Sequence, residues 1–176
     1  MIRAEGLQWG TPGRPLTPPL DLRLAAGSLT AVVGANGCGK SSLLRVLAGL
    51  QAPLAGRLRI AAQGLGAVGY LQQQQASHLP DPIELAQLVA AGLWRTRLPR
   101  SARRQRLDAA LAAWGLSELG GRPLVALSGG ELQRGLLARL ELTDAPLLLL
   151  NEPAAALDEA GQRLLWRRLA AWQRDG

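Results

Sequence analysis

The segment that most constrains this chain runs from Gly34 to Ser42 and fits the pattern G-x-x-x-x-G-K-[ST] of a phosphate-binding loop. Glycines let the backbone curl so that N–H groups point inward, and the following helix adds its positive N-terminus. Lys40 is the only lysine among 20 basic residues, which favours a compact ammonium there. The pattern predicts that Lys40 reaches the β- and γ-phosphates of a nucleotide and that Ser41 contacts Mg²⁺. The predicted nucleotide-binding residues of the loop are Gly34, Ala35, Asn36, Gly37, Cys38, Gly39, Lys40, Ser41 and Ser42.

The residues on either side of the loop suit the strand and helix that such a site needs. Residues 29–33, Leu-Thr-Ala-Val-Val, form a short apolar run, which predicts a buried parallel strand. Apolar residues then recur at helical spacing from Leu43 to Leu50, so residues 42–50 are predicted to be a helix. Strand, loop and helix therefore follow one another in the order that phosphate binding requires.

Composition places the chain among soluble globular proteins. With 176 residues, 48% hydrophobic and 19% charged, it is long enough for one domain with an inserted subdomain. No apolar stretch resembles a signal peptide or a membrane span, so we expect a protein that is neither secreted nor membrane-spanning. The single cysteine, Cys38, excludes an internal disulfide and fits a reducing compartment, and we interpret it as a small tolerated side chain.

The remaining periodicities predict strands and helices along the rest of the chain. Strands are expected at 2–9, 20–24, 56–60, 67–71 and 147–150, and helices at 82–91, 101–114, 130–142 and 159–172. Asp81 and Ser101 are the expected N-caps of the first two helices, with Pro82 at the first helical position. The tryptophans expected to be packing residues are Trp94, Trp114, Trp166 and Trp172.

A second glycine motif, Leu127-Ser-Gly-Gly-Glu-Leu-Gln-Arg134, opens the third of these helices. A serine hydroxyl followed by two glycines at a helix start offers donors to an anion, which predicts a second phosphate-binding helix terminus. The motif closely resembles the LSGGQ signature of ATP-binding cassette (ABC) transporter ATPases, with Glu131 in place of the usual glutamine. The resemblance implies that Ser128, Gly129, Gly130 and Glu131 contact the ATP of a partner subunit.

Other segments resemble the remaining motifs of this family in the same order. Residues 147–153 are similar to Walker B, with Glu152 as the implied general base, and residues 154–158 are similar to the D-loop ending at Asp158. Gln73 is the best match for the Q-loop glutamine that helps to hold metal and water, with Gln72 and Gln74 as register alternatives. Trp9 lies where the family places an aromatic residue that stacks on adenine; the alternative is a packed residue at the end of a strand.

The resemblance covers essentially the entire chain and implies its architecture. We expect an α/β P-loop NTPase core with a parallel sheet and an antiparallel β edge, built from residues 1–74 and 128–176, and an inserted α-helical subdomain from 75 to 127. The family implies a head-to-tail dimer that binds two ATP with Mg²⁺. It also implies membrane permease subunits, a substrate-binding protein if the system is an importer, and a place on the cytoplasmic face of the membrane. Metal-ion or metal-chelate importers are the most similar subfamily.

Two departures from the family pattern bear on hydrolysis. Position 151 is Asn where the family has Asp, so an acceptor oxygen is kept but its negative charge is lost, and weaker Mg²⁺ retention is expected. The family also has a further strand and a histidine that contacts the γ-phosphate, whereas this chain stops at Gly176 before either. We therefore expect a truncated product or a degenerate subunit. The only histidine, His78, is interpreted as a surface loop residue.

Two alternatives stay open at this point. One is an ATP-binding subunit with impaired hydrolysis. The other is a non-transport ABC ATPase acting on nucleic acid or the ribosome, since the net charge is +7 and six arginines cluster between residues 95 and 106. A solvated helical face is favoured over nucleic-acid binding, because no aromatic residues are interleaved for base stacking. The clustered residues are Arg95, Arg97, Arg100, Arg103, Arg104 and Arg106.

Overall fold

The computed structural model describes residues 1–175 except residues 12, 63, 65 and 73–82. The chain divides into two compact units, and each is considered by itself. Unit 1 holds residues 1–68 and 169–176, and unit 2 holds residues 69–168. In the part of the chain that the structure describes, no helix is long and apolar enough to cross a membrane.

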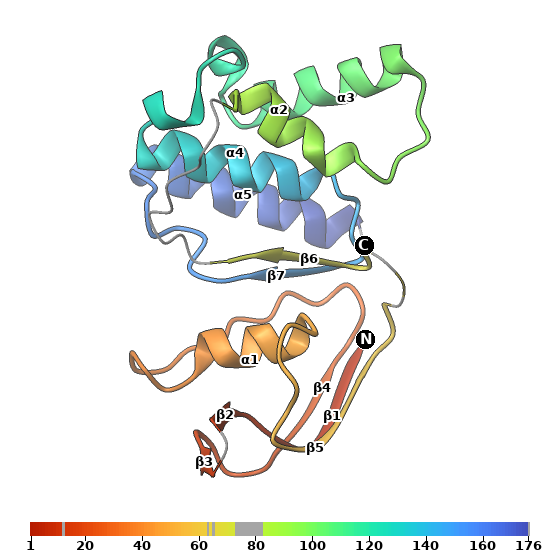
Figure 1. Cartoon of the computed structure of the whole chain (residues 1–176), viewed down its shortest axis with the longest axis vertical. Helices are drawn as coiled ribbons and strands as arrows, with labels where there is room; N and C mark the ends of the chain where they lie inside the picture. Colours follow the sequence, from red (N-terminus) through yellow and green to blue (C-terminus); the bar gives the residue numbers. More distant parts are fainter. Residues whose placement is uncertain (12, 63, 65, 73–82, 176) are drawn as a thin grey trace. The chain divides into compact units, whose positions relative to one another are not determined.

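The main sheet of unit 1 has three antiparallel strands. β1 (Ile2–Gln8) lies between β4 (Leu20–Leu24) and β5 (Ala55–Ile60), as Figure 1 shows. Ile2 pairs with Leu24 on one side and Ile60 on the other, so apolar side chains gather on one face. A Cβ atom at Gly56 would lie only 2.3 Å from the Gly6 carbonyl oxygen, so this close approach of β5 to β1 requires glycine. The strands expected near the N-terminus are confirmed, as is the expected antiparallel edge.

The N-terminal part of unit 1 also contains a short hairpin and a helix. The hairpin pairs β2 (Gly10–Thr11) with β3 (Arg14–Pro15), and the helix is α1 (Lys40–Leu47). α1 buries Leu43, Val46 and Leu47 on one face, which is the stripe that the sequence predicts. Its last residue is Leu47 and its C-cap is Ala48, before Gly49 with φ 72°, so Leu50 lies beyond the helix and is exposed.

The segment before the phosphate loop differs from its prediction. Residues 25–39 contain no helix or strand, and Leu29, Val32 and Val33 are exposed, with Val33 at 88%. A strand is stable only where a neighbouring strand supplies hydrogen bonds and packing. The described strands of unit 1 pair with one another and leave residues 29–33 outside their sheet. The prediction of a buried parallel strand at 29–33 is therefore wrong for this structure.

Unit 2 contains a two-stranded parallel sheet joined by a long helical connection. β6 (Val68–Leu71) pairs with β7 (Leu147–Leu150), and the sequence predicts both strands closely. Such a crossover is what parallel strands require. The intervening helices are α2 (Leu85–Ala90), α3 (Arg100–Ala113) and α4 (Gly129–Glu141), with short 3₁₀ turns at Ala91–Leu93, Ser117–Leu119 and Leu124–Ala126. α5 (Glu159–Asp175) follows the sheet.

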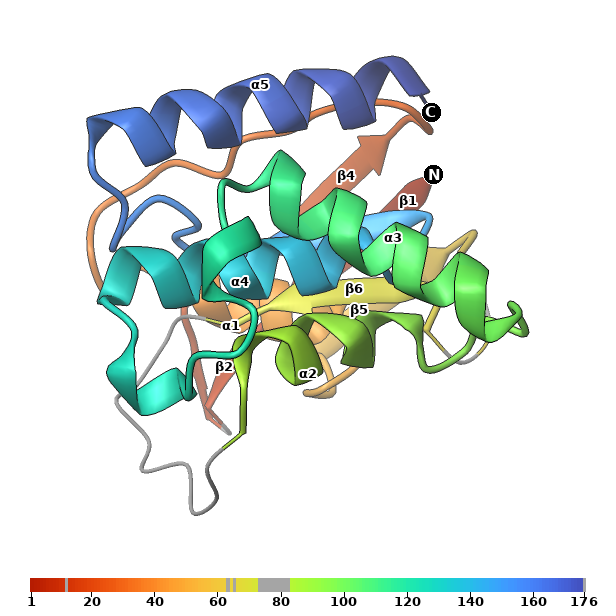
Figure 2. The same ribbon diagram turned by 90° about the horizontal axis from the view of Figure 1, so that it is seen from above.

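Helix α4 is the centre of the helical layer of unit 2. α2 packs against both α3 and α4 (Figure 2), and fully buried side chains fill the space between them. A Cβ atom at Gly135 would lie 2.5 Å from Leu85 Cδ1, and one at Gly92 would lie 2.3 Å from the Arg139 carbonyl oxygen. Glycine therefore lets α2 and the turn that follows it approach α4 closely. The largest fully buried side chains of this layer are Leu85, Val89, Leu93, Trp114, Leu116 and Leu137.

Helix α3 starts at a different residue from the one that local sequence signals predict. α3 begins at Arg100 with Pro99 at the N-cap, so Ser101 lies inside the helix and is not the cap that we predicted. The φ of −55° at Pro99 suits the approach to a helix, which explains the earlier start. Asp81 and Pro82 lie outside the described residues, and α2 starts at Leu85, where the Glu84 N–H donates to Gln87 Oε1.

The tryptophans are only partly packing residues. Trp114 is completely buried, whereas Trp94 and Trp166 are 59% and 58% exposed, so the packing prediction is wrong for these two. Trp114 Nε1 donates to Glu141 Oε2 at 2.8 Å, and Glu141 also forms an ion pair with Arg168. Because both charged side chains of that pair are largely shielded from water, the carboxylate of Glu141 ties together α3, α4 and α5.

We predict that Glu141→Gln lowers the free energy of unfolding by about 2 kcal/mol, because Arg168 would keep its charge at a shielded position without a carboxylate. Urea unfolding followed by circular dichroism measures the change. Asp108→Asn is the matched control, since Asp108 pairs with Arg104 on the exposed surface of α3 and its loss is expected to cost less than about 0.5 kcal/mol. Equal losses in the two variants would contradict the prediction.

Candidate functional site

The phosphate loop has the curled backbone that its sequence predicts. Gly37 and Gly39 have φ values of 80° and 95°, a region that glycine enters without steric cost. The Cys38 N–H donates to the Ala35 carbonyl oxygen at 3.3 Å, and a Cβ atom at Gly34 would lie 2.9 Å from Cys38 Sγ. The glycines are therefore needed for the shape of the loop.

The loop leads directly into the N-terminus of α1, where Lys40 is the first helical residue. Lys40 Nζ donates to the carbonyl oxygens of Gly34 at 2.8 Å and Ala35 at 2.9 Å, so the ammonium lies over the loop. An ammonium has three N–H donors, and the first backbone N–H groups of a helix have no acceptor in the preceding turn. Curled backbone, ammonium and helix terminus together fit a bound triphosphate.

Trp9 packs against the phosphate loop. The side chain is only 5% exposed, and its Nε1 donates to the Gly39 carbonyl oxygen at 3.0 Å, beneath the phosphate loop. The burial agrees with the packed alternative, and the stacking of Trp9 on adenine stays a prediction.

The signature segment forms a capped helix start in unit 2. The Glu131 N–H donates to Ser128 Oγ at 3.2 Å, and the Ser128 N–H donates to Glu131 Oε2 at 2.7 Å. This reciprocal pair is a capping box, and it starts α4 at Gly129, one residue before the predicted start. Because Ser128 Oγ acts as an acceptor here, its own hydrogen is directed elsewhere and suits a phosphate oxygen.

The capping box also affects the charge of Glu131. The hydrogen bond from the Ser128 backbone lowers the pKa of this carboxyl group below its ordinary value of 4.5, and the Ser128 side chain adds to the effect. Glutamine at the same position would make a similar hydrogen bond without a charge. The substitution in the signature therefore keeps the cap and adds a negative charge at the N-terminus of α4.

The signature helix packs on the segment that resembles the D-loop. Gln133, 5% exposed, donates from Nε2 to the Pro153 carbonyl oxygen at 2.9 Å, and a Cβ atom at Gly130 would lie 3.0 Å from the Ala156 carbonyl oxygen. Asp158 Oδ1 accepts from the Gly161 N–H at 2.8 Å and so caps α5. The sequence prediction missed Gln133, whose signal is a polar residue on a helix face that is otherwise apolar.

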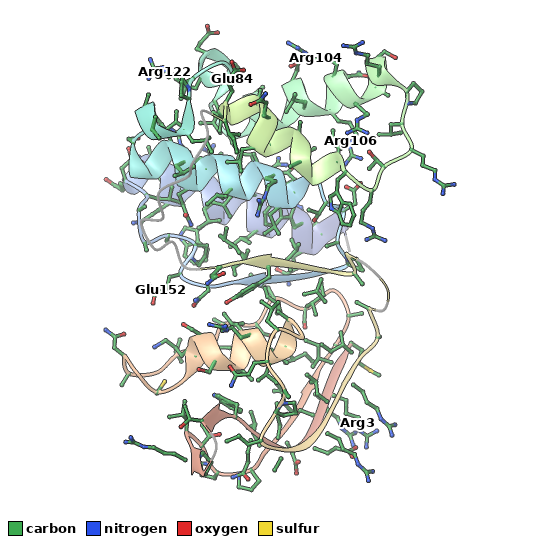
Figure 3. All side chains as sticks on the ribbon, in the orientation of Figure 1. Arg3, Glu84, Arg104, Arg106, Arg122 and Glu152 are labelled. Carbon is green, nitrogen blue, oxygen red and sulfur yellow. The ribbon has the colours of Figure 1, made fainter. Side chains whose placement is uncertain are left out.

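The two residues after β7 have very different surroundings. Asn151 is buried, and its N–H donates to the Leu71 carbonyl oxygen at 3.0 Å, which extends the β6–β7 pairing. Glu152 is exposed on the loop that follows β7 (Figure 3) and has φ 50°. A left-handed backbone is unfavourable for a residue with a side chain and is often found at functional sites. The backbone of Glu152 thus agrees with a functional position.

The predicted metal-binding residues offer neutral oxygens. Ser41 lies at the start of α1 in unit 1, Asn151 lies in unit 2, and Gln73 is outside the described residues, as is His78. Among the described residues, no three His, Cys, Asp or Glu side chains come together as a metal cluster. Hydroxyl and amide oxygens fit Mg²⁺ when phosphate oxygens supply the negative charge. The chain therefore fits a metal that arrives with a nucleotide.

The arginine cluster is only partly neutralised. Arg104 pairs with Asp108 at 2.9 Å and Arg106 pairs with Asp144 at 2.7 Å, and both arginines extend from α3 in Figure 3. Arg95, Arg97 and Arg100 are exposed. This arrangement agrees with the solvated helical face that the sequence favours.

Comparison with known proteins gives consistent matches. A sequence model described as "ABC transporter" matches residues 18–155. The chain is 40% identical over 169 residues to the nickel import ATP-binding protein NikO of Rhodobacter capsulatus, covering 88% of this chain and 66% of that protein. It is 35% identical over 175 residues to the zinc import ATP-binding protein ZnuC of Ruegeria pomeroyi, covering 99% and 65%. The chain thus spans just under two thirds of these relatives.

Two further comparisons extend the range of relatives. The cytochrome c biogenesis ATP-binding export protein CcmA of Pseudomonas syringae is 37% identical over 174 residues, covering 96% of this chain and 81% of that protein. The solved inward-facing structure of a putative metal-chelate type ABC transporter superposes with a TM-score of 0.80 at 30% identity, covering 98% of this chain and 68% of that one. The expected α/β fold is confirmed by this similarity.

We predict that acid weakens the cap of α4. A carboxyl group whose pKa is lowered by folding adds stability above its ordinary value of 4.5, and that stability is lost as the pH falls through the lower folded-state value. The melting temperature should therefore fall more steeply below pH 4.5 in the parent chain than in Glu131→Gln, which keeps a cap that does not titrate. Parallel curves for the two proteins would contradict the prediction.

Proposed function

Because the chain belongs to the ABC transporter family, we propose that it binds ATP with Mg²⁺, hydrolyses it, and powers transport through separate membrane subunits. The observation that carries the proposal is the phosphate loop. Two glycines at positive φ curl it, and Lys40 lies over it at the start of α1. A triphosphate is the ligand whose size and charge suit this combination of donors.

The capped start of α4 supports a proposal about assembly. Ser128 Oγ and the first N–H groups of α4 form a second set of anion donors in the same chain. We propose that this set, with Gly129, Gly130 and Glu131, contacts the ATP held by a second ATP-binding subunit in a head-to-tail dimer. ATP binding then stabilises the dimer, and hydrolysis releases it.

The proposed chemistry is assigned to the residues that follow β7 and to the Q-loop glutamine. Glu152 would accept a proton from the attacking water, and its exposed carboxylate on a fixed loop agrees with that task. Asn151, Ser41 and Gln73 would hold Mg²⁺, which neutralises charge on the phosphate oxygens when bound. Asp158 would take part in the subunit contact through the D-loop.

The relatives support a proposed cargo class and location. Two are nickel and zinc import proteins, a structural neighbour is a putative metal-chelate transporter, and another relative is an exporter. We propose metal ions or metal chelates as the cargo, with permease subunits and, in an importer, a substrate-binding protein as partners. The subunit would then lie at the cytoplasmic face of the membrane through its permease.

A second candidate function is an ATP-binding subunit with impaired hydrolysis. Its support is the burial of Asn151, since a shielded neutral amide attracts Mg²⁺ less strongly than a shielded carboxylate. Nucleotide binding does not depend on this residue in the same way, because the phosphate loop supplies its own donors. The two candidates therefore predict the same affinity for ATP and different rates of turnover.

We predict that Lys40→Ala lowers ATP affinity by about 10-fold or more, because a charge-assisted contact to phosphate is lost. Equilibrium binding of a fluorescent ATP analogue measures the change. Arg45→Ala is the matched control, since Arg45 is an exposed cation on the same helix. The proposal fails if both variants bind as the parent chain does.

We predict that Asn151→Asp raises steady-state ATPase activity by about 10-fold and lowers the Mg²⁺ concentration needed for half-maximal activity, because a carboxylate restores the missing charge. Phosphate release under Mg²⁺ titration measures both quantities. Glu152→Gln in the same background should abolish the gain. A variant no faster than the parent would remove Asn151 as the cause of slow turnover.

A further inference from the structure

The outer face of the three-stranded sheet in unit 1 carries a row of arginines. Arg3 on the central strand β1 lies directly opposite Arg23 on β4 and Arg59 on β5. All three residues are exposed, and Arg3 extends outward from the sheet in Figure 3. Residues directly opposite each other in an antiparallel pair have Cβ atoms about 5 Å apart. These three residues, called the arginine row below, therefore present their guanidinium groups side by side to one ligand.

Acidic side chains compensate the arginine row only in part. Glu5 Oε1 lies 2.7 Å from Arg3 Nε, so the central arginine has an ion-pair partner. Asp21, on the same face, accepts a hydrogen bond from a backbone N–H of β1 at 2.6 Å. Among the residues that the structure describes, neither Arg23 nor Arg59 forms an ion pair. The row therefore keeps positive charge that the protein itself does not neutralise.

This arrangement works against the stability of the sheet. Like charges directly opposite each other destabilise a strand pair, whereas the apolar neighbours Ile2, Leu24 and Ile60 on the other face stabilise it. A local arrangement that costs stability without a compensating contact is expected where function requires it. Arginine also offers N–H donors in a planar fork that matches the oxygens of phosphate. The row thus has the chemistry of an anion-binding surface.

The composition of this face restricts the ligand. The exposed residues of the segments 3–5, 21–23 and 57–59 are all charged. A protein partner needs apolar or aromatic anchors at the centre of its contact, and the bases of a nucleic acid need aromatic rings to stack on. A second copy of the same face would be repelled by its positive charge. A ligand that binds through negative charge alone therefore fits this face best.

We propose that the arginine row binds a linear polyanion of repeated phosphate groups, of which inorganic polyphosphate is the simplest example. Each guanidinium donates to the oxygens of a different phosphate group along the chain, and the ligand neutralises the charge that repels one arginine from the next. The site lies outside the phosphate loop and needs neither Lys40 nor a nucleotide, so the inference goes beyond the proposed function.

The test uses long-chain inorganic polyphosphate as the probe and calorimetry at about 0.15 M salt as the measurement. All proteins carry Lys40→Ala, which weakens binding of phosphate at the loop. The test variant adds Arg23→Gln and Arg59→Gln and leaves the Arg3–Glu5 pair in place. The matched control adds two substitutions that remove the same charge from exposed residues of unit 1 outside the row, Arg14→Gln and Arg45→Gln.

We expect polyphosphate to bind the Lys40→Ala chain, to bind the test variant about 10-fold or more weakly, and to bind the control with little change. The slope of log affinity against log salt should fall by about one for each phosphate contact that the test variant loses. Without polyphosphate, the test variant should melt about 1 to 3 °C higher than the Lys40→Ala chain, because the repulsion in the row is relieved. Unfolding would then not explain its weaker binding.

Absence of polyphosphate binding to the Lys40→Ala chain would overturn the proposal, as would equal losses in the test variant and the control. Two further ligands are measured in parallel: a single-stranded RNA oligonucleotide, and vesicles of phosphatidylcholine with phosphatidylglycerol. Tighter binding of either one, lost in the test variant alone, would also overturn the proposal, because the partner would then be a nucleic acid or a membrane.

Discussion

The arrangement of helices and strands in unit 2 depends on close packing around α4. Three glycines, Gly69, Gly92 and Gly135, bring a strand, a turn and a helix so near that any added Cβ atom would lie under 3 Å from an atom of α4 or of α2. Interiors this dense respond to a change of a single methylene. The direction of α4, and hence of the Ser128 donors at its start, follows from contacts made along its whole length.

Helix α4 also contacts the segment that follows β7. Gln133 bonds to the Pro153 carbonyl oxygen, and Gly130 lies against the Ala156 carbonyl oxygen, so α4 and the loop that contains Glu152 are fixed to each other. A buried polar group without a hydrogen bond is costly, so the Gln133 contact favours this one arrangement of α4 and the loop.

Much of the fold and of the candidate site was predictable because its signals are local. Period-two alternation predicted β4, and helical spacing predicted α1 and α3. Ser128 followed by two glycines predicted a helix start within one residue of the start of α4. The exposure of residues 29–33 and the burial of Trp9 were not predictable, because a strand depends on its neighbour and burial depends on tertiary packing. The φ of Glu152 and the buried contact of Gln133 likewise arise only from tertiary structure.

The starts of α1 and α4 differ in the charges that surround their backbone N–H donors. At α1 the ammonium of Lys40 and the curled loop supply both charge and direction. At α4 the Glu131 carboxylate lies on the Ser128 N–H, so it stabilises the helix dipole and at the same time reduces the attraction for an anion. The α4 start therefore contributes directional donors more than charge.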